Sequence, residues 1–248
     1  MRVITLTNQK GGYGKTTTAV NLAAYLALAG KKVLLVDLDP QGSSTTHVGI
    51  DKNSSIRTMN DVMLNRSTLP EVIQHTEIQG LDIAPSNNAV GEAEMLLTKQ
   101  SFREQVLRGK LSDINGYDLT VIDTPPAIGN LTMNAIIASD MVIVPIQTQF
   151  FALEGLSQLT DLLDEIGNTG YKPRRCYLLT MHNKTRVICK KIAESVRELP
   201  GDNVFKTTIH DNVKLIEAPS YGKPIALHTP ESPGARSYEG LAKEVLVA

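Results

Sequence analysis

The amino-acid sequence predicts an α/β fold: a doubly wound, mostly parallel sheet with helices on both faces. Apolar, strand-like runs alternate with helix-like segments along most of the 248 residues, which is the pattern of a parallel sheet. Two runs, VLLVD at residues 33–37 and LTVID at residues 119–123, are continuously apolar up to a final aspartate. Such runs are typical of strands that helices bury on both faces. The length suits one domain that spans residues 1–248.

The expected elements follow from hydrophobic periodicity and from the positions of glycines. Strands are expected at residues 3–7, 33–37, 81–84, 119–123, 141–145, 176–180 and 204–209. Helices are expected at residues 15–29, 92–110, 153–166, 186–198 and 235–246, with a weaker helical pattern over residues 56–75. Because parallel sheets bind ligands at the carboxyl ends of their strands, we expect a site in the loops that follow the strands.

The composition is that of an ordinary globular protein, with 42% hydrophobic and 21% charged residues. The two cysteines, Cys176 and Cys189, lack the spacing of metal ligands and are expected to be reduced thiols in a cytoplasmic protein. The N-terminus has no signal-peptide pattern, and Ser139 and Asp140 interrupt the apolar stretch at residues 135–146. We therefore expect neither a secreted, disulfide-rich domain nor a membrane-spanning helix.

Charge is unevenly distributed along the chain. The net charge is −1, yet residues 171–248 hold 13 Lys and Arg against 8 Asp and Glu, whereas residues 1–170 hold 12 against 18. This asymmetry indicates either a basic face built by the C-terminal third or charge scattered over solvated surfaces. Tryptophan is absent and aromatic residues make up 4% of the chain, so stacking on nucleobases is not expected.

A glycine-rich loop follows the first expected strand and precedes the first expected helix. This is the context of a phosphate-binding loop, in which backbone N–H groups and a helix N-terminus face phosphate oxygens. Lys15 then lies over the β- and γ-phosphates, and the Thr16 hydroxyl suits Mg²⁺. The residues expected to bind the nucleotide here are Lys10, Gly11, Gly12, Tyr13, Gly14, Lys15, Thr16 and Thr17.

Three aspartates stand at the ends of two further expected strands. Asp37 and Asp39 end or follow the strand at residues 33–37, and Asp123 ends the strand at residues 119–123. Carboxylates beside a phosphate loop suit Mg²⁺ binding and the positioning of water. The expected metal site therefore comprises Thr16, Asp37, Asp39 and Asp123, with Mg²⁺ as the ion; the resemblance described next implies ATP as the nucleotide.

The run KGGYGKT at residues 10–16 departs from the common phosphate-loop motif, because Gln9 stands where that motif has its first glycine. The run resembles the deviant Walker A motif of the ParA/MinD superfamily of P-loop ATPases. The stretches DLDPQ at residues 37–41 and DTPP at residues 123–126 resemble its two switch regions. NVKLIEAPSYGKPI and SPGARSYEGLAKEV, both after residue 211, resemble the end of Soj-type ParA proteins.

The resemblance implies roles for single residues. Lys10 corresponds to the signature lysine, which reaches the nucleotide of the other subunit in an ATP-sandwich homodimer, whereas Lys15 serves its own ATP. Asp39 is implied to orient the attacking water, while Asp37 supports the metal and Asp123 joins the Mg²⁺ shell. The catalytic set is thus Lys10, Lys15, Asp39 and Asp123. Asn212 is expected near the adenine and the dimer face.

The resemblance also implies a function, that of an ATPase for chromosome or plasmid partition. Its ATP dimer binds DNA without sequence preference on the nucleoid, and a ParB-like cargo adaptor stimulates a slow hydrolysis that releases it. Phosphate contacts from lysine and arginine read no bases. The residues expected to contact DNA are Lys184, Arg186, Lys190, Lys191 and Lys214.

The sequence departs from the family pattern at several of these positions. Tyr13 occupies a slot usually filled by a small residue, either as exposed bulk or as packing across the dimer face. His210 and Asp211 stand where the family has Pro-Arg, which removes one possible DNA contact. Arg186 is displaced by one residue from the family's arginine, and Lys190 and Lys191 add compensating charge.

Other functions remain open from the sequence. Similar proteins move carboxysomes or chemoreceptor arrays. A MinD-like membrane ATPase would need a basic amphipathic C-terminal helix, and AKEVLVA lacks that character, so no membrane partner is expected. A metal cluster like that of the nitrogenase iron protein would need cysteines near the site, and neither Cys176 nor Cys189 lies near the phosphate loop in sequence. A sequence-specific repressor would need a helix-turn-helix before Lys10, where none is expected.

Overall fold

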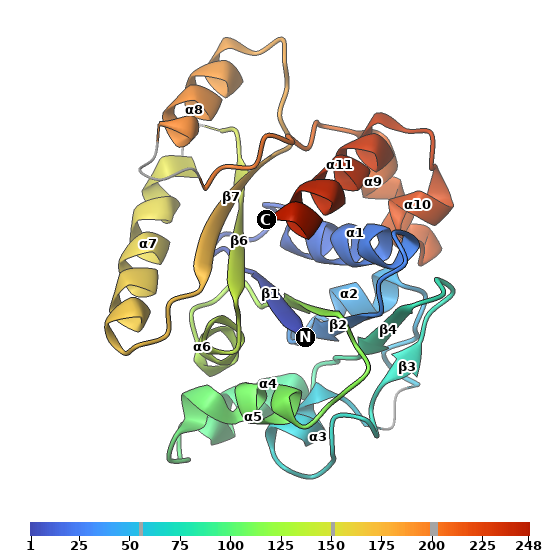
Figure 1. Ribbon diagram of the computed structural model, residues 1–248, viewed down its shortest axis with the longest axis vertical. Helices are drawn as coiled ribbons and strands as arrows, with labels where there is room; N and C mark the ends of the chain where they lie inside the picture. Colours follow the sequence, from blue (N-terminus) through green and yellow to red (C-terminus); the bar gives the residue numbers. More distant parts are fainter. Residues whose placement is uncertain (55–56, 150–151, 199–202) are drawn as a thin grey trace.

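A sheet of seven strands forms the centre of the part of the chain that the computed structural model describes, residues 1–54, 57–149, 152–198 and 203–248. The strand order is β3-β4-β2-β5-β1-β6-β7 (Figure 1). Neighbouring strands are parallel except β3 and β4, which are antiparallel at one edge. The strands are β1 (Arg2–Leu6), β2 (Val33–Asp37), β3 (Gln74–His75), β4 (Leu81–Ala84), β5 (Leu119–Asp123), β6 (Met141–Gln147) and β7 (Arg174–Thr180).

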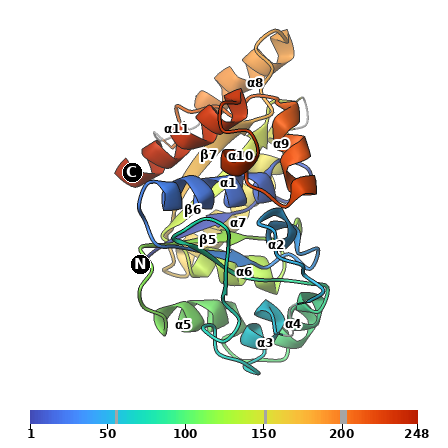
Figure 2. The ribbon, with the colours of Figure 1, turned by 90° about the vertical axis from the view of Figure 1, so that its right-hand side faces the viewer.

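Helices cover both faces of this sheet, as the continuous apolar strands predicted. On one face α1 and α11 pack on a core that includes Leu6, Leu35 and Val121; Figure 2 shows these helices on the opposite side from α3, α4 and α5. The helices are α1 (Lys15–Leu28), α2 (Ser43–His47), α3 (Met59–Met63), α4 (Val90–Leu97), α5 (Val106–Ser112), α6 (Asn130–Ile137), α7 (Ala152–Asn168), α8 (Val187–Arg197), α9 (Val213–Glu217), α10 (Ile225–His228) and α11 (Pro233–Val247), with 3₁₀ turns η1 (Arg103–Gln105) and η2 (Ala218–Tyr221).

The strand expected at residues 204–209 is wrong. This segment runs beside β7 and meets it in an isolated bridge between Tyr177 and Val204. A continuous ladder does not form because the backbone N–H groups of Lys206 and Thr207 donate instead to the Glu244 carboxylate on α11, at 2.9 and 2.6 Å. The sequence of this segment has a β-strand pattern, but Glu244, which is distant in sequence, accepts hydrogen bonds from two of the N–H groups that a strand would use.

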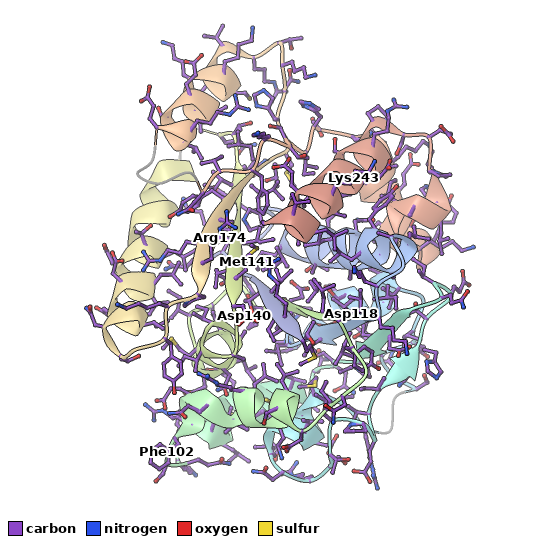
Figure 3. All side chains as sticks on the ribbon, in the orientation of Figure 1. Phe102, Asp118, Asp140, Met141, Arg174 and Lys243 are labelled. Atoms are coloured by element: carbon purple, nitrogen blue, oxygen red, sulfur yellow. The ribbon has the colours of Figure 1, made fainter. Side chains whose placement is uncertain are left out.

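Two expected helices are shorter than predicted. The helix at residues 92–110 is broken between α4 and α5, where Phe102 adopts a left-handed backbone with φ of 55°; Figure 3 shows this residue at the outer end of the turn. Residues 55–56 of the weak helical pattern lie outside the described residues. From residue 57 onward that pattern yields only α3, which a capping box of Thr58 and Asp61 begins, and then β3.

Strand register brings the ends of the three central strands together. Leu6 of β1 and Asp37 of β2 each pair with Asp123 of β5. The carboxyl ends of β2 and β5 therefore present two aspartates side by side, next to the loop that leaves β1. Asp118 and Asp140, labelled in Figure 3, mark the opposite, amino ends of β5 and β6. Within the described residues, every helix is too short or too polar to cross a membrane.

Candidate nucleotide-binding site

The loop after β1 has the backbone of a phosphate-binding loop. Gly12 and Gly14 adopt left-handed conformations, with φ of 79° and 86°, which glycine reaches without steric cost. Helix α1 begins at Lys15 directly after Gly14, and no side chain caps its N-terminus. The first N–H groups of the helix therefore remain available for an anion.

Two side chains, one just after β1 and one at the end of β7, hold this loop in place. The Asn8 amide donates to the Pro145 carbonyl at 2.6 Å and accepts from the Lys10 N–H at 3.0 Å. The Thr180 hydroxyl at the end of β7 donates to the Tyr13 carbonyl at 3.1 Å. Sequence reasoning missed Asn8 and Thr180, although both follow or end expected strands and their position was the available signal.

Tyr13 is not exposed bulk, and its packing across a dimer face stays a prediction. Its side chain is half-buried and packs against the apolar cluster formed by β6, β7, α7 and α8 of its own chain. The residue therefore joins the phosphate loop to the β7 side of the protein. Its backbone still belongs to the loop that was expected to bind the nucleotide.

Lys15 is buried at the centre of the site, with 7% of its surface exposed. Its ammonium lies 3.5 Å from the Lys10 carbonyl oxygen. Burial lowers the pKa of Lys15, and the charges of Asp123 and Asp39 act in the opposite direction. A lysine held between two carboxylates at a helix N-terminus is suited to a polyphosphate, which would bring negative charge to it.

Asp37 is fully buried, and both of its oxygens already accept hydrogen bonds. One oxygen accepts from the Asp39 N–H at 3.0 Å, and the other accepts from the N–H and hydroxyl of Thr45 at 2.9 and 2.8 Å. Burial and the charge of Asp123 raise the pKa of Asp37. Asp37 therefore fixes the loop between β2 and α2, while its predicted support of the metal stays a prediction.

Asp123 is also fully buried but is only half satisfied. The Ser44 hydroxyl donates to its Oδ2 at 2.8 Å. Its Oδ1 is buried without a hydrogen-bond partner in the described part of the chain. Burial raises the pKa of Asp123, and the hydroxyls of Thr16 and Ser44 and the charge of Lys15 lower it. A buried carboxylate oxygen left open beside the Thr16 hydroxyl fits the donor set that Mg²⁺ requires.

Asp39 stands at the mouth of the site, with 9% of its surface exposed. Its Oδ1 accepts from the Gln41 N–H at 2.9 Å. Ser86, which follows β4, clamps this segment, because its hydroxyl donates to the Asp39 carbonyl at 2.7 Å and its N–H donates to Thr45 Oγ1 at 2.9 Å. Sequence reasoning did not single out Ser86.

The residues expected to contact DNA lie on the surface away from the carboxylates. Lys184 and Arg186 precede α8, and Lys190 and Lys191 lie on it; all four are exposed. Lys214 lies on α9 and forms an ion pair with Glu217 at 2.8 Å. Asn212 caps α9 by accepting from the Lys214 N–H at 2.9 Å, and its predicted nucleotide contact stays a prediction.

Gly42 offers a test of this carboxylate-bearing segment. Its φ is +60°, and a Cβ at this position would lie 2.7 Å from the Ser86 carbonyl oxygen and 2.9 Å from Lys52 Cδ. We expect Gly42→Ala to cost about 3 kcal/mol of unfolding free energy and to abolish ATP turnover by displacing Asp39. Gly30→Ala is the control, because Gly30 is also left-handed but a Cβ there would meet nothing within 4 Å in the described part of the chain. It should keep turnover at a cost of about 1 kcal/mol, and wild-type turnover in Gly42→Ala would contradict the assignment.

Comparisons with known proteins agree with this geometry. A family model described as an AAA domain matches residues 1–174. The chain is 43% identical to the sporulation initiation inhibitor protein Soj of Bacillus subtilis, over 98% of each chain. It is 40% identical to the chromosome-partitioning ATPase Soj of Thermus thermophilus, over 99% of this chain and 96% of that protein.

Solved structures share the fold. Cobyrinic acid a,c-diamide synthase from Mycobacterium smegmatis, solved with ADP and magnesium, has a TM-score of 0.86 at 28% identity, over 99% of this chain and 94% of that one. McdA of Cyanothece, solved as a complex with ATP, has a TM-score of 0.89 at 21% identity, over 100% and 96%, and shows the fold alone. The near-complete matches in sequence and the phosphate loop beside paired aspartates lead to one assignment: the chain belongs to the ParA/Soj family of P-loop ATPases.

Proposed function

We propose that residues 1–248 act as one ATPase domain that partitions DNA. ATP and Mg²⁺ are its cofactors, and hydrolysis to ADP and phosphate is its reaction. The observation that carries the proposal is the open, buried Asp123 Oδ1 beside Lys15 at the start of α1. The relatives Soj of Bacillus subtilis and the chromosome-partitioning ATPase Soj of Thermus thermophilus are 43% and 40% identical to this chain, whereas McdA is 21% identical, which favours chromosome or plasmid DNA over another cargo.

We assign a task to each group of the site. The N–H groups of the loop from Gly11 to Thr17 bind the phosphates, and Lys15 contacts the β- and γ-phosphates. Thr16 and Asp123 would hold Mg²⁺, and Asp37 and Asp39 would support the ion from neighbouring positions. When bound, the ion supplies positive charge that neutralises the phosphates during transfer.

Asp39 is the group that positions the attacking water. Its Oδ1 is already fixed by the Gln41 N–H, which leaves Oδ2 to accept a hydrogen bond from water. Ser86 and Asp37 hold its backbone, because the Ser86 hydroxyl donates to the Asp39 carbonyl and the Asp39 N–H donates to Asp37. The carboxylate is therefore pre-oriented before the nucleotide binds.

Lys10 serves the nucleotide of a second copy. Its carbonyl faces Lys15 within its own chain, and by the resemblance to the family its loop belongs to the dimer face. A cation supplied by the partner acts on the transferred phosphate as an arginine finger does. Hydrolysis thereby requires the ATP-bound homodimer.

The dimer binds duplex DNA through backbone phosphates and so resides on the nucleoid of the cytoplasm. The exposed lysines and arginines at α8 and α9 supply the positive charge, and the scarcity of aromatic side chains fits contacts that read no sequence. A ParB-like adaptor on the cargo stimulates hydrolysis and releases the dimer.

The two lysines of the phosphate loop are separable by mutation. Lys15→Ala should lower ATP affinity roughly a hundredfold or more, because it removes a buried charge-assisted contact to phosphate. Lys10→Ala should keep ATP affinity but lose the dimer and turnover. Binding of a fluorescent ATP analogue, sedimentation and phosphate release measure these three properties. Lys31→Ala, on an exposed lysine after α1, should match wild type in all three. Full turnover in Lys10→Ala would contradict its role in the dimer.

DNA binding should depend on the nucleotide. With ATP, the wild type should bind random-sequence duplex DNA and weaken steeply with salt, whereas with ADP or without nucleotide it should not bind. Asp39→Ala should lower turnover roughly a hundredfold or more and prolong the DNA-bound state. Lys214→Ala should weaken binding to all sequences alike. Absence of DNA binding in every nucleotide state, from protein that still binds ATP, would refute the proposal.

Glu217 limits the contact that Lys214 offers. The hydrogen bond to Glu217 raises the pKa of Lys214, and a DNA phosphate must replace that carboxylate. Glu217→Gln should therefore raise DNA affinity roughly two- to fivefold at low salt, which is the size expected of an exposed ion pair. Glu239→Gln is the matched control, because it removes the same charge from an ion pair with Lys243, 2.6 Å long, on α11 (Figure 3). An equal gain in both variants would show a non-specific charge effect.

A further inference from the structure

Two histidines lie together between β7 and the basic helix α8. His182 follows the end of β7, and His210 precedes α9; their ring centroids are 5.7 Å apart. Backbone bonds fix the pair, because the His182 N–H donates to the Ile209 carbonyl at 3.0 Å and the Asp211 N–H donates to the His182 carbonyl at 3.3 Å. In Figure 1 the segment that leads to α9 passes beside the upper end of β7, below α8.

The rings have unused hydrogen-bonding capacity. His210 Nδ1 lies 3.2 Å from the His182 carbonyl oxygen. Because a carbonyl oxygen only accepts, Nδ1 carries the hydrogen, and Nε2 is the ring nitrogen that can take up a proton. His182 Nδ1 is buried and has no hydrogen-bond partner among the described residues. Both side chains are only half-buried, so a ligand from solvent meets the exposed parts of the two rings. It reaches His182 Nδ1 only if that ring turns, because the atom is buried in this structure.

Positive groups from each neighbouring element act on His182. They are Lys184 from the loop after β7, Lys190 and Arg197 from α8, and His210 from the segment before α9. Arg197 reaches across to Thr208, with its Nη2 3.5 Å from Oγ1. The carboxylates nearby in sequence are Asp211, Glu194 and Glu198, which are exposed; none of them is among the groups that shift the pKa of His182.

Burial lowers the pKa of His182, and His210, Arg197, Lys184 and Lys190 lower it further. The free protein therefore keeps this ring neutral near pH 7. An anion bound among the same cations would favour the protonated form of the His182 ring, because its negative charge stabilises the imidazolium. The surrounding positive charge also disfavours a divalent cation, and the described residues contain no group of three or more metal-ligating side chains.

We propose that His182 and His210, together with Lys184, Lys190 and Arg197, form a proton-gated site for a backbone phosphate of duplex DNA. The inference rests on the DNA binding proposed above and adds two contact residues and a linked proton to it. Protonated imidazole donates N–H bonds to phosphate oxygens, whereas the neutral ring offers one donor and no charge.

The site predicts that DNA affinity rises as pH falls. Phosphate binding raises the imidazole pKa above its value in the free protein, so protons are taken up on binding between those two pKa values. Each proton taken up strengthens binding by up to about tenfold per pH unit in that window. Above the pKa of the bound state the gain disappears.

The test is the affinity for random-sequence duplex DNA from pH 8 to pH 6 at fixed ionic strength. Full-length protein is loaded with Mg²⁺ and a non-hydrolysable ATP analogue. The wild type should gain roughly fivefold or more over this range, whereas His182→Gln/His210→Gln should match it at pH 8 and gain little. His75→Gln is the matched control, because His75 lies on β3 at the far edge of the sheet and contacts Asp82 at 2.6 Å; it should keep the wild-type gain.

Two further measurements separate a phosphate contact from a structural role. His210→Arg carries a permanent charge and should bind tightly at pH 8 with a flatter pH profile. The NMR signal of His182 should show a higher pKa when DNA is bound. An unchanged pH profile in the double glutamine variant, or a gain that phenanthroline abolishes by chelating a transition metal, would overturn the inference while leaving DNA binding intact. Absence of DNA binding at every pH would instead refute the proposed function.

Discussion

Two buried carboxylates placed side by side are the constraint on which the rest of the site depends. Asp37 and Asp123 are register partners on the adjacent strands β2 and β5, and both are fully buried. Each raises the cost of charging the other, because burial removes water and like charges repel at short range. A fold that keeps both residues must supply donors and a cation, and the loops around the site are arranged to do so.

The compensation differs between the two residues, and that difference bears on function. Both oxygens of Asp37 already accept hydrogen bonds, from Thr45 and from the Asp39 N–H. These bonds fix the β2–α2 loop. Asp123 keeps one oxygen open while Lys15 and two hydroxyls offset part of its charge. A fully satisfied site would have no capacity for a cation, since a metal must find lone pairs that protein donors have not taken. The unsatisfied oxygen thus has a cost in the free protein that a bound cation would remove.

The sequence predicted the centre of the protein well and its periphery poorly, for a physical reason. Strands β2, β4 and β5 lie where their apolar runs placed them, because burial on both faces leaves a strong local pattern. The clamps by Asn8, Ser86 and Thr180 were missed, since each is a single polar side chain that acts on a segment distant in the chain. The same cause explains the wrong strand at residues 204–209, where Glu244 on α11 takes two N–H groups. The five-residue helices α2 and α9 are too short for hydrophobic periodicity to reveal.

The carboxyl end of β7 connects the phosphate loop with the basic surface. Three consecutive residues make the connection: the Thr180 hydroxyl bonds to the Tyr13 carbonyl, Met181 follows, and the His182 N–H bonds to the Ile209 carbonyl. Met181 adopts a left-handed backbone with φ of 48°, which costs a non-glycine residue about 1 kcal/mol or more. Hydrogen bonds on both sides hold it there, and a Cβ at Gly14 would be only 3.9 Å from its methyl group. A shift of the phosphate loop would therefore be transmitted to His182 over one residue, because this segment has little freedom to absorb the shift. In the function proposed above, coupling between nucleotide and DNA would then require no large domain movement, only a different position for the end of one strand.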